Sequence, residues 1–217
     1  DKAESEPETA RKLNADGPGN LARLADRLGI PLVHFSTDYV FDGVAGAPYR
    51  EDSKTNPLGV YAKTKLMGEQ AVRAAGGYVF RLQWVFDSRG KNFFLTMKKL
   101  LAEREEVRVV ADQLGAPSNA LHIAQAITRA IPSILAGGLP PAIYHLTASG
   151  HTSWHGFATA IAEASQSKAR VVPIVTAEYP TPAARPKDAR LDCGALASHG
   201  ITMPHWREGL AQAMRDA

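Results

Sequence analysis

The first third of the chain alternates between helical and strand-like hydrophobic patterns. Between Glu6 and Leu28, apolar residues recur mostly at three- and four-residue spacing and Gly29 follows, which predicts a helix with a C-terminal stop. The formal G-x-G-x-x-A match at residues 17–22 lies in this helical pattern, so it is interpreted as a bend within a helix. Residues 30–36 are apolar and rich in β-formers, which predicts a buried strand that ends in Ser36-Thr37-Asp38.

The same alternation continues along the chain. The pattern predicts helices at 60–75, 92–104, 121–135 and 154–164, and strands at 78–86, 107–110, 143–146 and 171–174. Strands that alternate with helices imply right-handed crossovers and a parallel sheet. We therefore expect an α/β protein with a Rossmann-like, doubly wound parallel sheet and a small α+β lobe formed mainly by the C-terminal part.

Composition narrows the class of protein. The 217 residues are 45% hydrophobic and 22% charged, which is ordinary for a globular protein. The net charge of +3 comes from basic residues scattered along the chain, which argues weakly for anionic ligands and against nucleic acid. The single Cys193 excludes an internal disulfide framework, and no apolar run is long enough to cross a membrane. These features predict a cytoplasmic protein.

Tyr61 and Lys65 form the first candidate constellation. They are four residues apart and so lie on one face of the predicted helix at 60–75. A phenol can donate a proton to the alkoxide that develops when a carbonyl is reduced, and a nearby ammonium favours the phenolate and lowers the phenol pKa. The spacing alone is also typical of an ordinary helix surface.

Hydroxyl groups at a strand end strengthen this interpretation. Thr37 lies at the carboxyl end of the strand that precedes the Tyr61 helix, where open α/β sheets place their ligand crevice. A Ser or Thr that polarises a carbonyl, a Tyr that donates the proton and a Lys that orients a cofactor ribose is the arrangement of a short-chain dehydrogenase. Thr37 alone would also fit a strand-end hydroxyl bonded to its own turn.

At this point the sequence resembles the dTDP-4-dehydrorhamnose reductase family, a group of extended short-chain dehydrogenases. The matching stretches are residues 1–7, 36–43 (STDYVFDG), 48–51, 56–65 (NPLGVYAKTK), 112–117 and 180–186. The resemblance implies that residues 1–140 are the remainder of an NAD(P)-binding domain with the catalytic residues, and that 141–217 mainly form a smaller, interleaved substrate-binding lobe.

The resemblance also implies roles for individual residues. Thr37 would contact the 4-keto oxygen, Tyr61 would donate the proton, and Lys65 would hold the nicotinamide ribose. Asp38 and Trp84 would face the sugar. The implied reaction is the NADPH- or NADH-dependent reduction of dTDP-4-dehydro-L-rhamnose to dTDP-L-rhamnose, which supplies polysaccharide biosynthesis. Some family members are magnesium-linked dimers, but no motif here assigns metal ligands, so magnesium and a homodimer stay open.

Two departures from the family pattern affect these expectations. Leu82-Gln83 replace small hydroxyl residues before Trp84, which changes the expected sugar pocket. The family also opens with a strand, a Gly-rich turn and a helix that hold the cofactor pyrophosphate, and these do not precede Asp1 in this sequence. We therefore expect the first strands to lie outside this chain, no turnover from residues 1–217 alone, and no sequence basis for choosing NADPH or NADH.

Two other functions use the same scaffold. One is a non-catalytic regulatory protein of the methionine adenosyltransferase regulatory-subunit type, and the other is a nucleotide-sugar epimerase or dehydratase. The retained Thr37, Tyr61 and Lys65 favour the reductase. His151 and His155 are four residues apart, yet the Glu of H-E-x-x-H is absent, so they are interpreted as surface or capping residues.

Overall fold

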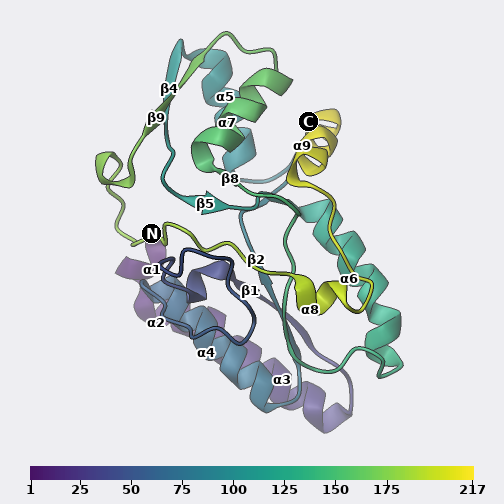
Figure 1. Ribbon diagram of the computed structural model, residues 1–217. Helices are drawn as coiled ribbons and strands as arrows, with labels where there is room; N and C mark the ends of the chain where they lie inside the picture. Colours follow the sequence, from purple (N-terminus) through teal and green to yellow (C-terminus); the bar gives the residue numbers. More distant parts are fainter. The chain divides into compact units, whose positions relative to one another are not determined.

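The computed structural model describes residues 1–217, which divide into two compact units (Figure 1). The helices are α1 Lys2–Ser5, α2 Pro7–Arg11, a π-helical turn Lys12–Asp16, α3 Gly17–Leu28, a 3-10 turn Asp38–Val40, α4 Val60–Ala74, α5 Phe93–Glu103, α6 Ala120–Leu135, α7 Trp154–Ala164, a 3-10 turn Thr176–Glu178, α8 Gly194–Ala197 and α9 Trp206–Asp216. The strands are β1 Val33–Thr37, β2 Tyr78–Leu82, β3 Val85–Phe86, β4 Glu106–Val110, β5 Leu114–Gly115, β6 Ser118–Asn119, β7 Ile143–His145, β8 Thr152–Ser153 and β9 Arg170–Ile174.

The first unit contains a parallel sheet in the order β1-β2-β7. It is formed by residues 1–82, 126–146 and 181–202. Thr37 pairs with Leu82, and Arg81 pairs with His145, so the carboxyl ends of the three strands are in register. Figure 1 shows α3 and α4 running side by side, and α4 packs on β1 and β2. This arrangement places the start of α4 near the end of β1.

The N-terminal helical pattern appears as one continuous run with an irregular turn. The π-helical turn Lys12–Asp16 precedes α3, and Gly17-Pro18-Gly19 forms the start of α3. The run ends at Gly29, whose φ of +64° is a left-handed conformation that glycine adopts without strain. The expected bend therefore lies slightly earlier than the glycines, and residues 17–22 form helix, as the polar residues before them indicated.

The second unit contains three two-stranded sheets and most of the aromatic core. It is formed by residues 83–125, 147–180 and 203–217. β3 pairs with β6 and β4 with β9 in parallel, whereas β5 and β8 are antiparallel. Phe86, Phe94, Phe157 and Trp206 are buried in one cluster among α5, α7 and α9. α9 was not predicted from the sequence.

Three outcomes follow for the sequence-based expectations. The α/β class with a Rossmann-type parallel arrangement is confirmed. The predicted strand at 78–86 divides into β2 and β3, because Trp84 takes a φ of +44° that a continuous strand cannot contain. The compact units are built from discontinuous segments, since segment 83–125 packs with 147–180, and the expected division of function near residue 140 stays a prediction. None of the helices has the length and apolar character required to cross a membrane.

Candidate active site

Thr37 lies buried at the carboxyl end of β1. Its hydroxyl donates to Asp38 Oδ1 at 3.0 Å and accepts from the backbone N–H of Tyr39 at 3.2 Å. Thr37 thus caps the 3-10 turn that follows the strand, which is the structural role that a strand-end hydroxyl can also have. Asp38 is 2% exposed, so a carboxylate is held beside the hydroxyl in a poorly solvated place.

Tyr61 lies in the first turn of α4 and is the more accessible member of the set. It is 40% exposed, and its ring meets the ring of Tyr39 edge to face at 6.5 Å. Burial raises the pKa of Tyr61, the Asp38 carboxylate raises it further, and the Thr37 hydroxyl opposes both effects without cancelling them. The phenol is therefore protonated at neutral pH and close to both Thr37 and Asp38.

Lys65 follows one turn later and is directed at strand β1. Its ammonium donates to the backbone oxygen of Phe35 at 2.5 Å and lies 3.3 Å from His34 Nε2. Burial lowers the pKa of Lys65, and burial together with the Lys65 charge lowers the pKa of His34 to about 4. The Nε2 atom of neutral His34 accepts a hydrogen bond from the Lys65 ammonium, so both side chains have a hydrogen-bond partner.

The expected effect of Lys65 on Tyr61 is wrong for this geometry. We expected the Lys65 charge to lower the pKa of the phenol, but Lys65 is not among the groups that shift it, and the net shift of the Tyr61 pKa is upward. The reason is local: the Lys65 ammonium is directed to Phe35 and His34, while the Asp38 carboxylate acts on the phenol. The acidity of Tyr61 is consequently set by burial and by Asp38.

Tyr61 opens into a cavity of about 220 Å³ in the first unit. The lining residues are Asp1, Glu4, Tyr39, Leu58, Gly59, Tyr61, Ala62, Ala183, Ala184, Arg185 and Pro186. This volume is below the roughly 300–1,000 Å³ of sites that hold a whole drug-sized ligand, so it suits one part of a ligand. Sequence reasoning missed Glu4 and Arg185 as site residues, although both lie in the stretches that carried the resemblance.

The Ser36 hydroxyl is an unsatisfied polar group next to these residues. It is buried and has no hydrogen-bond partner. Because side chains alternate along a strand, Ser36 lies on the same face of β1 as His34, which is the face that Lys65 contacts. A buried hydroxyl left unpaired costs about 1–3 kcal/mol, so this position fits a polar group supplied by a ligand or water.

The loop after β1 is held by a compact hydrogen-bond network. Tyr49 Oη donates to Asp42 Oδ1 at 2.8 Å, and Asn56 Nδ2 donates to Asp42 Oδ2 at 2.9 Å. These two hydrogen bonds lower the pKa of Asp42. The backbone of Tyr49 also exchanges hydrogen bonds with Arg190 and Asp192. The loop therefore fixes the segment between Arg185 and α8.

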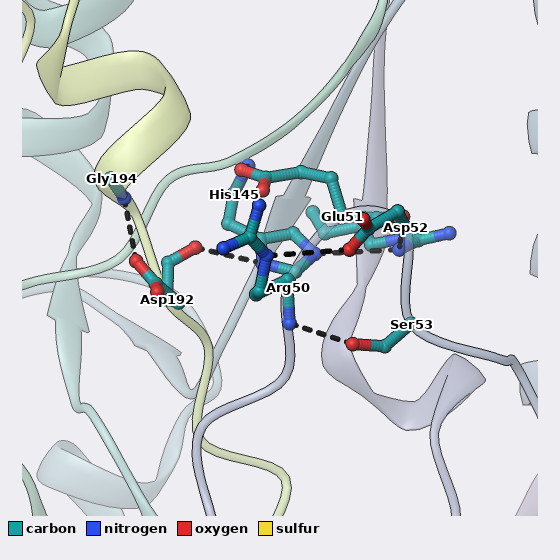
Figure 2. Close-up of polar contacts among 8 residues, drawn as sticks. Arg50, Glu51, Asp52, Ser53, His145, Asp192 and Gly194 are labelled. Atoms are coloured by element: carbon teal, nitrogen blue, oxygen red, sulfur yellow. Dashed lines mark hydrogen bonds and ion pairs between the residues drawn. The ribbon is translucent and has the colours of Figure 1, made fainter.

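A second group of contacts joins this loop to the end of β7. Figure 2 shows Glu51 and Asp192 on either side of His145. Glu51 Oε1 accepts from the backbone N–H of His145 at 3.1 Å, and His145 Nδ1 lies 3.0 Å from the Asp192 oxygen. Asp192 Oδ1 accepts from the N–H of Gly194 at 2.7 Å, at the start of α8. Both long loops of the first unit thus converge on one strand end.

Trp84, the remaining predicted site residue, belongs to the second unit. Its ring stacks on Trp154 with centroids 3.6 Å apart, and its φ of +44° is a conformation that non-glycine residues rarely adopt. Gln83, which replaces a small hydroxyl residue of the family pattern, is buried, and its Oε1 accepts from the N–H of Ala116 at 2.7 Å. The departure at Gln83 therefore supports the loop between β5 and β6.

The two histidines and the glycine motif singled out in the sequence do not form a metal or phosphate site. Across residues 1–217, no group of three or more His, Cys, Asp or Glu side chains is arranged to hold a metal ion. His155 Nε2 lies 3.3 Å from the Val171 oxygen, within the second unit. The residues at 17–22 are helical, so they do not form the strand-turn-helix that a dinucleotide phosphate site requires.

A parallel strand that ends in buried hydroxyls, followed by a helix with Tyr and Lys one turn apart, defines a Rossmann-type oxidoreductase of the short-chain kind. The model of the RmlD substrate binding domain family matches residues 1–217, and the chain belongs to this family.

Named relatives agree with this membership. The chain is 43% identical to a dTDP-4-dehydrorhamnose reductase of Burkholderia thailandensis, with 100% of this chain and 78% of the relative covered. It is 38% identical to the enzyme of that name from Escherichia coli, with 100% and 75% covered. The crystal structure of dTDP-4-dehydrorhamnose reductase from Bacillus anthracis in complex with NADP has a TM-score of 0.94 and 35% identity, and covers 100% of this chain and 76% of that one.

Proposed function

We propose that this chain carries the catalytic and substrate-binding residues of an NAD(P)H-dependent reductase that converts dTDP-4-dehydro-L-rhamnose to dTDP-L-rhamnose. The observation that carries the proposal is the convergence of Thr37, Asp38 and Tyr61 at the carboxyl end of β1, in a chain 43% identical to an enzyme of this name. A protonated phenol beside a second hydroxyl is what carbonyl reduction requires.

In this proposal Tyr61 is the proton donor and Thr37 positions the ketone. The raised pKa of Tyr61 keeps the phenolic proton in place at neutral pH until the substrate oxygen becomes an alkoxide. The Tyr61 O–H bond then breaks, and the proton passes to the oxygen. The Thr37 hydroxyl, which donates to Asp38 and accepts from the N–H of Tyr39, would turn its proton from Asp38 to the same oxygen and so polarise the carbonyl.

The residues near Lys65 fit the nicotinamide end of the cofactor. When bound, NADPH or NADH supplies the hydride that reduces the carbonyl carbon. Lys65 is a partly buried donor one turn from Tyr61, and the unpaired Ser36 hydroxyl lies on the same face of β1. A ribose hydroxyl matches this set of donors and acceptors, so Lys65 would hold the ribose and orient it toward Tyr61.

Substrate recognition divides among three groups. Asp38 would accept from a sugar hydroxyl, and contact of Trp84 with the sugar stays a prediction from the family resemblance. Arg185 lines the cavity together with Tyr61, and its Nη2 atom lies 3.7 Å from Asp1 Oδ2. Its charge would face the diphosphate of the dTDP-sugar, which binds best to a guanidinium. The small cavity beside Tyr61 would take the sugar ring.

The decisive assay measures NADPH oxidation by the full-length protein with dTDP-4-dehydro-L-rhamnose. Tyr61→Phe removes only the phenolic oxygen, and we expect turnover to fall by at least about 10²-fold. Tyr179→Phe, which removes the same atom from an exposed tyrosine, serves as the matched control and keeps its activity. No turnover by the wild type despite NADPH binding would overturn the reductase and favour a non-catalytic protein on the same scaffold.

The assembly state and location complete the proposal. We infer a cytoplasmic enzyme from the single cysteine, and a homodimer from the family resemblance. Light scattering of the full-length protein, with and without magnesium, tests the dimer directly. A measured molar mass equal to that of one chain under both conditions would contradict the homodimer.

A further inference from the structure

The first turn of α4 is held by a carboxylate from a distant segment. Helices begin with backbone N–H groups that have no partner within the helix, and the N-cap residue of α4 is Gly59, which has no side chain to accept from them. The N–H of Val60 instead donates to Glu4 Oε1 at 2.7 Å, across 56 positions of sequence. Glu4 belongs to α1, which packs against α4.

Gly59 leaves the space that this carboxylate occupies. A Cβ at residue 59 would lie 2.6 Å from Glu4 Oε1, a separation that real Cβ atoms do not show. The backbone of Gly59 has a φ of −114° and a ψ of 172°, which any residue adopts without strain. A side chain at residue 59 would therefore have to displace the Glu4 carboxylate, whereas the backbone conformation does not itself require glycine.

The contact lies one residue from Tyr61. Glu4, Gly59 and Tyr61 all line the same cavity, and the position of the phenol follows from the direction in which α4 begins. Burial, Asp38 and Thr37 set the pKa of Tyr61, and Glu4 is not among the groups that shift it.

We propose that Glu4 is a positioning residue for Tyr61, which fixes the first turn of α4 through Val60, and that Gly59 is small in order to admit it. This inference rests on the proposed function, because it assigns a consequence to the placement of the proton donor. A misplacement of about 1 Å can lower a rate by about 10²-fold, so loss of a helix-start anchor has a measurable effect.

Four variants of the full-length protein test the role. Glu4→Ala removes the acceptor, and we expect kcat to fall about tenfold with KM within about twofold. Glu4→Gln keeps an acceptor oxygen, so it retains most of the wild-type kcat and the same pH profile. Gly59→Ala pushes the carboxylate away and resembles Glu4→Ala. The double variant is no worse than the more impaired single one, because both changes remove one contact.

Hydrogen exchange at the start of α4 provides a readout that does not depend on turnover. We expect Glu4→Ala to speed exchange of the Val60 amide, while Glu8→Ala, at an exposed glutamate of α2, leaves it unchanged. Thermal melting excludes general unfolding as the cause of any loss.

Each contrary result has a distinct meaning. If Glu4→Ala keeps wild-type kcat and exchange in an active enzyme, the positioning role is overturned alone. If Glu4→Gln is as impaired as Glu4→Ala, the effect belongs to charge, and the role as stated is also overturned. A wild type without turnover overturns the proposed function, and the positioning role falls with it even where exchange changes.

Discussion

The start of α4 and the tryptophan pair of the second unit are organised by different forces. Around Tyr61, a hydrogen bond joins Thr37 to its neighbour Asp38, and another joins Val60 to Glu4 across 56 positions of sequence. Around Trp84, position comes from ring packing and a strained backbone. The position of a group around Tyr61 therefore depends on one or two atoms, whereas the position of the Trp84 ring depends on many van der Waals contacts.

The tryptophan pair illustrates the second arrangement. Trp84 and Trp154 stack at 3.6 Å, and Trp154 Nε1 donates to Gln113 Oε1 at 3.2 Å. A Cβ at Gly115 would lie 2.5 Å from the Trp84 ring, so the strand β5 supports the ring from another side. A residue held at a positive φ costs roughly 1–3 kcal/mol, and such strain persists where the surroundings determine the position strongly.

The largest expected effect comes from the buried ion pair between α4 and β2. Arg81 and Glu69 are 2% and 1% exposed in their side chains, and their charged groups meet at 2.7 Å. Arg81→Met leaves the Glu69 charge buried without its partner, so we expect the free energy of unfolding to fall by about 3–5 kcal/mol. Urea denaturation measures this change.

The double variant Arg81→Met/Glu69→Met separates the effect of the unpaired charge from the effect of changed side-chain packing. It removes both charges, so it is expected to recover much of the stability that the single variant loses. If Arg81→Met were as stable as the wild type, the Arg81–Glu69 ion pair would not contribute to holding α4 on β2.

The second prediction concerns Thr37, whose hydroxyl contacts Asp38 and the N–H of Tyr39. Thr37→Val is nearly isosteric and removes the polarising hydroxyl, so kcat/KM of the full-length enzyme should fall about 10²-fold. Thr37→Ser keeps the hydroxyl and should retain most of the activity. Because Thr37→Val also removes the acceptor that caps the 3-10 turn, thermal melting of the variant accompanies the steady-state kinetics, and Thr37→Val with full activity would exclude a chemical role for the hydroxyl.

The third prediction disturbs the aromatic region without altering a polar group. Gly115→Ala places a methyl group against the Trp84 ring, so the stack on Trp154 must open. We expect KM for the sugar nucleotide to rise about tenfold with a smaller change in kcat, as when a binding contact is lost. Circular dichroism of the coupled tryptophans should weaken in this variant and persist in Trp206→Phe. A weakened signal with unchanged KM would separate Trp84 from substrate binding.

The sequence predicted the elements better than the contacts between them. Periodicity identified β1 and α4 and the Tyr61-Lys65 pair because these depend on neighbours within a few residues. It could not identify the contact of Glu4 with Val60, which spans 56 positions, or the split of the strand at Trp84, which depends on a tertiary stack. It also gave the wrong pKa direction for Tyr61, because spacing on a helix does not show that Lys65 is directed at Phe35.

The last prediction concerns the acid stability of the first unit. Burial and the Arg81 charge lower the pKa of His145 to about 3. Arg81 only donates, so His145 Nε2 accepts from it and Nδ1 carries the proton toward the Asp192 oxygen. In the unfolded chain this pKa is about 6.5. Between these values the unfolded state binds more protons, so stability falls as the pH falls.

Replacing the imidazole tests this linkage. Between pH 6.5 and pH 5 the wild type should lose about 1.5 kcal/mol more stability than His145→Gln, whose amide does not titrate. Urea denaturation at both pH values gives the difference. Equal pH dependence of stability in His145→Gln and the wild type would show that His145 binds a proton in the folded chain as readily as in the unfolded chain.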